Sequence, residues 1–103
     1  MTQQEAKKEQ RRLNRYLPVK VVLERIHEQI PDVWDATKIV GKWVWIETDT
    51  KPERTVREML SDLGFHWNTK REAWQHPCGE FRKFCPKGDP RDHYASIDAK
   101  ELV

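Results

Sequence analysis

No apolar stretch of the sequence approaches the ~20 residues needed to cross a bilayer, and the first residues contain no apolar signal region. We therefore expect a cytoplasmic protein that does not bind membranes. Only two cysteines, Cys78 and Cys85, are present, which is too few for a disulfide framework and agrees with a reducing compartment. The four glycines form no phosphate-binding loop, which disfavours an enzyme that uses a nucleotide.

Groups that form catalytic centres are equally scarce. Serine occurs only at Ser61, inside a predicted helix, and at Ser96, near the C-terminus. The nucleophile candidate is Cys78, which follows His76 by two residues and would need a lowered thiol pKa to act as a thiolate. We expect that the protein is not an enzyme and that it needs no cofactor.

The same region holds the candidate metal ligands. A structural zinc site needs four thiolate or imidazole ligands in tetrahedral geometry. The chain offers His76, Cys78, Cys85 and His93. Six residues separate Cys78 from Cys85, whereas zinc knuckles usually place about two to four between their paired ligands. The spacing favours two buried or idle thiols over a metal site.

Charge is abundant and unevenly distributed. Charged residues make up 35% of the 103 residues, and the net charge is +2. The positive excess lies in residues 1–30, where seven basic side chains face four acidic ones. Arg11, Arg12 and Arg15 belong to this segment, which is either an arm that binds a polyanion or a solvated helix face.

Apolar residues recur at helical spacing in three segments. These segments predict helices over residues 4–17, 19–30 and 56–63. Before the third helix, Thr50 and Glu53 have the spacing of a capping box, and Gly64 has the position of a left-handed residue after it. Residues 31–40 are expected to be irregular.

Short runs of aromatic and β-branched residues predict three strands. These runs are residues 43–46, 65–68 and 72–76, and Asn68 and Thr69 favour a hairpin between the last two. In the first strand, Trp43 and Trp45 point to one face, and the aliphatic residues between and after them point to the other. We expect the helix at 56–63 to cover the aliphatic face.

These elements predict one domain over residues 1–103, with an α+β fold. A basic helical part (1–30) precedes a β-α-β-β core (41–78) with a small three-stranded sheet containing antiparallel pairs. The tail (79–103) is expected to be irregular, and its last residues add either a short strand or a helix.

Five tryptophans in so short a chain are the most prominent aromatic feature. Four of them lie in predicted strands: Trp43, Trp45, Trp67 and Trp74. Bases stack on such rings for about 1–3 kcal/mol each, and Lys70 and Arg71 at the hairpin turn are placed to follow a phosphate backbone. The alternative is that the N-terminal helices cover the indole face, which would make it a second core layer.

The most specific motif in the chain is the spacing Phe-x-Trp, Lys-Arg, Trp. It stands at Phe65, Trp67, Lys70-Arg71 and Trp74, after a strand that reads GKWVWIE. With this motif, about residues 13–94 resemble a family of small proteins from Gram-positive conjugative elements, plasmids and phages. Some members are labelled as molybdopterin-guanine dinucleotide biosynthesis proteins. That label implies a nucleotidyltransferase with a glycine-rich N-terminal loop, which this sequence lacks, so we do not adopt it.

The resemblance implies two functions. The predicted strand–helix–hairpin unit is similar to the annealing module of fork-remodelling helicases, which engage junctions between single strands and duplexes. This implies nucleic-acid contacts from Trp67, Lys70, Arg71 and Trp74. The chain also resembles type II-A anti-CRISPRs, which implies inhibition of Cas9, through competition with guide RNA or by occupation of its basic channel.

We therefore expect a non-enzymatic binding protein whose partner is Cas9 or the Cas9–guide RNA complex, or else single-stranded or junction DNA or RNA. The net charge of +2 argues against direct mimicry of nucleic acid. An inhibitor would instead bind the effector through exposed aromatics or through acidic side chains. The acidic candidates are Asp32, Asp35, Glu47 and Asp49.

Overall fold

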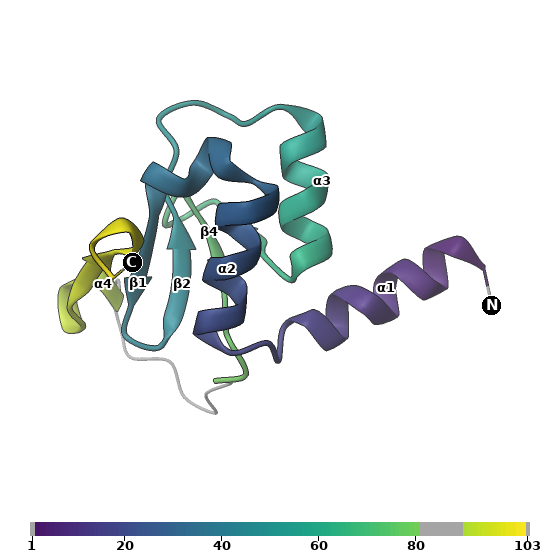
Figure 1. Ribbon diagram of the computed structural model, residues 1–103, viewed down its shortest axis with the longest axis horizontal. Helices are drawn as coiled ribbons and strands as arrows, with labels where there is room; N and C mark the ends of the chain where they lie inside the picture. The colour runs from purple at the N-terminus through teal and green to yellow at the C-terminus, as the bar shows by residue number, and fades with distance from the viewer. Residues whose placement is uncertain (1, 81–89, 103) are drawn as a thin grey trace.

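The computed structural model describes residues 2–80 and 90–102, apart from the side chain of His93 (Figure 1). It has the predicted α+β fold, with helices and a five-stranded sheet in the order β3-β4-β2-β1-β5. All four strand pairings are antiparallel. In the described part of the chain, every helix is too short or too polar to traverse a lipid bilayer.

The predicted helices are present. They are α1 (Gln3–Asn14), α2 (Val19–Gln29) and α3 (Arg54–Leu63), followed after the core by the short α4 (Pro90–His93). Thr2 caps α1 by accepting a hydrogen bond from the Glu5 amide at 3.1 Å, and Pro18 precedes α2. Gly64 ends α3 in the left-handed conformation, with φ of 107°, as its position predicts. Figure 1 shows α1 extending away from the sheet.

The predicted capping box before α3 does not form. The helix begins at Arg54, and Glu53 is its N-cap without a side-chain hydrogen bond. Thr50 therefore lies four residues before the first helical residue, too far back to cap it. Residues 48–52 instead form an open loop between β2 and α3 (Figure 1).

The three predicted strands are β2 (Trp43–Ile46), β3 (His66–Asn68) and β4 (Ala73–His76), and β3 and β4 form the predicted hairpin. Two further strands complete the sheet, β1 (Thr37–Val40) and β5 (Ser96–Asp98). The expectation that residues 31–40 are irregular was wrong, because a 3₁₀ helix (η1, Pro31–Ala36) leads directly into β1. The C-terminal segment contains both of the alternatives considered, β5 and then a second 3₁₀ helix (η2, Ala99–Glu101).

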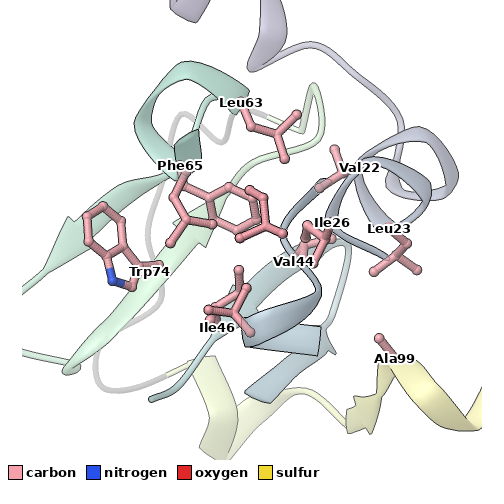
Figure 2. Close-up of a cluster of buried hydrophobic side chains, with 12 residues drawn as sticks. Val22, Leu23, Ile26, Val44, Ile46, Leu63, Phe65, Trp74 and Ala99 are labelled. Atoms are coloured by element: carbon pink, nitrogen blue, oxygen red, sulfur yellow. The ribbon is translucent and has the colours of Figure 1, made fainter. Parts of the chain in front are cut away.

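The main core lies between the sheet and the helices α2 and α3 (Figure 2). Val44 and Ile46 of β2 are fully buried there, as predicted from the alternation of that strand. From the helices, Ile26 and Leu60 are also fully buried. Trp74 of β4 lies at the edge of this cluster in Figure 2, where the sheet extends beyond the helices.

Candidate functional site

The strand register separates the four tryptophans of the sheet into two pairs on opposite faces. Residues directly opposite each other in an antiparallel pair share a face. Trp74 is opposite Ile46 and also opposite Trp67, so both indoles belong to the helix-covered face. Trp45 is opposite Gln75 and therefore lies on the other face, with Trp43. Trp67 and Trp74 therefore do not share a face with Trp43 and Trp45.

Trp45 is not available to an external ligand, because it is only 1% exposed. The guanidinium groups of Arg71 and Arg91 lie 5.7 Å and 5.0 Å from its ring centroid. Arg91 also donates to Glu47 at 2.6 Å. Burial opposes ionisation of Glu47, but its hydrogen bonds with Lys38 and Arg91 hold its pKa below the usual value. Two of the predicted contacts, Trp45 and Arg71, thus serve an internal cation–π and ion-pair network.

Trp43 is half-buried, and its indole contacts other residues of the chain. Its Nε1–H donates to the main-chain carbonyl of Glu80 at 2.9 Å. Its ring meets His66 edge to face, with centroids 6.3 Å apart. Burial and the nearby Arg15 lower the pKa of His66, so this imidazole is neutral at pH 7.

Trp67 is the tryptophan that remains most accessible, with 44% of its surface exposed, whereas Trp74 is 8% exposed. The two rings lie 5.7 Å apart at a tilt of 60°. Lys70 is exposed in the hairpin turn that follows β3. Of the predicted aromatic–cationic group, Trp67 and Lys70 therefore lie at the surface.

The basic residues of α1 are largely paired within the protein. Arg11 donates to Asp62 of α3 at 2.9 Å, and Lys7 lies 3.7 Å from the same carboxylate. Arg12 pairs with Glu9 at 2.6 Å. Arg15 is exposed and forms no ion pair with a described residue. The arm therefore presents fewer unneutralised charges than its sequence suggests.

His76 and Cys78 are in contact but do not form an activated pair. The fully buried His76 donates from Nε2 to the carbonyls of Asn14 (2.8 Å) and Leu63 (3.1 Å), and its Nδ1 accepts the Cys78 amide proton at 2.9 Å. Burial lowers the pKa of His76 to about 4 and raises the pKa of the Cys78 thiol to about 12. Both groups are neutral at pH 7, whereas nucleophilic catalysis by cysteine needs a thiolate.

The predicted metal ligands divide between described and undescribed parts of the chain. His76 and Cys78 are committed to the hydrogen bonds just given, while Cys85 and the side chain of His93 lie outside the described residues. Among the described residues, no three or more His, Cys, Asp or Glu side chains are grouped to hold a metal ion.

The acidic candidates Asp32, Asp35, Glu47 and Asp49 line one hollow of about 560 Å³, together with Glu53. We call this hollow the acidic groove. The ends of η1 and β2 bring these residues together, because the Glu47 amide donates to the Ala36 carbonyl at 3.0 Å. Apart from Glu47, these carboxylates form no ion pair with any residue that the structure describes.

A second hollow of about 620 Å³ adjoins the β2–α3 loop, and residues 48–52 line both hollows. We call it the Trp67 hollow. Beyond the shared loop, its lining residues include Arg57, Trp67, Glu72 and Trp74. Within the described atoms, the buried Nε of Arg57 and Nε1 of Trp74 have no hydrogen-bond partner. The sequence did not indicate that Arg57, Glu72 and Glu53 line these hollows, because charged residues are common at helix starts and in turns.

No protein-family model, curated protein or solved structure that was compared with the chain matches it. Around the β2–α3 loop, the surface offers carboxylates without ion-pair partners among the described residues and the exposed indole of Trp67. Such groups suit the binding of another macromolecule.

Proposed function

We propose that the protein is a non-enzymatic inhibitor from a mobile genetic element, acting in the bacterial cytoplasm by binding Cas9 or the Cas9–guide RNA complex. The family resemblance of residues 13–94 supports this proposal. The observation that carries it is the acidic groove. Cas9 holds its guide–target duplex in a positively charged channel, and an acidic surface complements such a channel.

The charge distribution favours this partner over free nucleic acid. The net charge of the chain is +2, but five carboxylates and one lysine line the acidic groove, and of these carboxylates only Glu47 forms an ion pair with described residues. On α1, by contrast, Arg11 and Arg12 already pair with carboxylates of the same chain, those of Asp62 and Glu9. Complementary charge across an interface raises the association rate and selects the partner.

A DNA-cleavage assay with purified Cas9 tests the proposal. The protein is added either before or after Cas9 has been loaded with guide RNA, and cleavage of a matched target is followed over time. We expect protection at molar excess of the protein. Stronger protection when it is added first would indicate competition with the guide. Undiminished cleavage in both orders would refute the proposed function.

A second candidate is binding of single-stranded or junction nucleic acid by an accessory module. The exposure of Trp67 beside Lys70 favours it, as does Arg15, which has no ion-pair partner among the described residues. Each phosphate contact would contribute about 0.7–0.9 unit to the slope of log affinity against log salt. Lys70→Ala should then weaken binding equally for all sequences. Absence of a mobility shift with single-stranded and forked DNA at low salt would exclude this candidate.

A further inference from the structure

The chain itself shows how this fold accommodates an arginine on an indole. Arg91 lies over Trp45 with 5.0 Å between the guanidinium carbon and the ring centroid. The same guanidinium donates to the carboxylate of Glu47 at 2.6 Å. The indole and the carboxylate thus both contact one arginine, and a planar guanidinium can stack on a ring while it donates to a carboxylate.

The Trp67 hollow also combines an indole with carboxylates, and Arg57 lies in its lining. Trp67 is 44% exposed, and Asp49 and Glu72 are carboxylates in the same lining. No cation of the described residues lies over the Trp67 ring. We propose that this hollow binds an arginine side chain of the partner protein, with the guanidinium on Trp67 and hydrogen-bonded to Asp49 or Glu72. The inference rests on the proposed function in placing that arginine on Cas9.

Charge selects a basic peptide over a nucleotide at this place. Lys51 and Arg57 in the hollow are balanced by Asp49 and Glu72, and the adjoining acidic groove adds further carboxylates. The carboxylates of the acidic groove repel a phosphate group and attract a segment with several basic residues.

The direct test is an NMR titration that follows the five indole Nε1–H resonances of the full chain, assigned with single Trp→Phe variants. The probes are a short arginine-containing peptide and the same peptide with citrulline, which keeps the shape but lacks the charge. We expect the Trp67 and Trp74 signals to shift with the arginine peptide, and the citrulline peptide to bind at least about tenfold more weakly. Equal binding of both peptides, no shift, or shifts centred on Trp34 or Trp43 would overturn the inference.

Variants separate this inference from the proposed function. Trp67→Ala and the double variant Asp49→Asn/Glu72→Gln should each weaken binding of the arginine peptide at least about fivefold, whereas the charge-matched control Glu24→Gln/Glu101→Gln, outside both hollows, should not. Circular dichroism verifies that each variant is folded. If both hollow variants lose peptide binding but still inhibit Cas9 fully, the Trp67 hollow does not bind an arginine of Cas9. That part of the inference is then refuted, and the proposed function stands. If the wild type binds the peptide but leaves Cas9 active, the proposed function fails and the arginine site stands.

Discussion

Trp67 and Trp74 face each other across the β3–β4 hairpin with ring centroids 5.7 Å apart, yet one ring is 44% exposed and the other 8%. The difference arises because β3 is the edge strand of the sheet, whereas β4 is paired on both sides. Trp74 therefore packs against the core, and Trp67 extends the same aromatic surface into the solvent. A core tryptophan and an exposed tryptophan are thus joined in one pair.

This pairing predicts unequal effects on stability. Trp74→Ala should lower the free energy of unfolding by about 3–5 kcal/mol, because it removes a large side chain from the core cluster. Trp67→Ala should cost only about 1 kcal/mol, the value of the ring–ring contact. Urea unfolding followed by circular dichroism measures both. Equal losses for the two variants would contradict the assignment of Trp74 to the core.

Acid should destabilise the protein through His76. The unfolded chain protonates this imidazole near the ordinary histidine pKa of 6.5, whereas burial lowers the pKa in the folded chain to about 4. The contribution of the neutral imidazole is therefore complete above about pH 6.5 and is lost progressively as the pH falls toward 4. The total loss is about 3 kcal/mol.

Urea unfolding at several pH values between 7 and 4 measures this loss. His76→Gln should flatten the profile in this window, apart from the smaller contribution of His66, whose pKa is also lowered. Glu47, whose pKa is lowered, should add a loss only at pH values below the ordinary glutamate pKa of 4.5. A profile that stays equally steep after His76→Gln would contradict the environment described for this histidine.

Cys78 should be unreactive in the folded protein. Burial raises the pKa of its thiol to about 12, so the thiolate fraction at neutral pH is negligible. Alkylation by iodoacetamide should be much slower in the native protein than in urea, measured by mass spectrometry with Cys85→Ser so that a single thiol remains. Rapid native alkylation would show that Cys78 and His76 form an activated pair.

Local patterns predicted the helices and the hairpin because these depend on neighbours in sequence. The apolar spacing of α3, Gly64 after it and Asn68 at the turn each act over a few residues. The Asn68 side chain accepts a hydrogen bond from the Arg71 amide at 3.0 Å, which is the turn chemistry expected of asparagine.

The distribution of the indoles could not be predicted in the same way. Shifting a strand by one residue moves every side chain to the opposite face, so the four-residue turn at 69–72 decides where Trp74 points. Glu72 in that turn adopts φ of 53°, which the sequence does not indicate. Strand β1 was missed because its four residues, interrupted by Lys38, are stabilised by pairing with β2 and β5.

The acidic candidates were identified from the sequence, but their grouping was not. Asp32 and Asp35 lie in η1, while Asp49 follows β2. These segments meet only because β1 folds back on β2 with Thr37 opposite Ile46. Sequence patterns do not specify such a long-range register.

The affinity of the protein for Cas9 tests the central claim most directly, when two charge-matched variants are compared by biolayer interferometry. The variant Asp32→Asn/Asp35→Asn/Asp49→Asn removes three of the five carboxylates of the acidic groove, and Glu24→Gln/Glu28→Gln/Glu101→Gln removes the same charge elsewhere. We predict that the first binds Cas9 at least about tenfold more weakly than the wild type, mainly through slower association, and that the second binds within about twofold. Equal affinities for the two variants would contradict docking through the acidic groove.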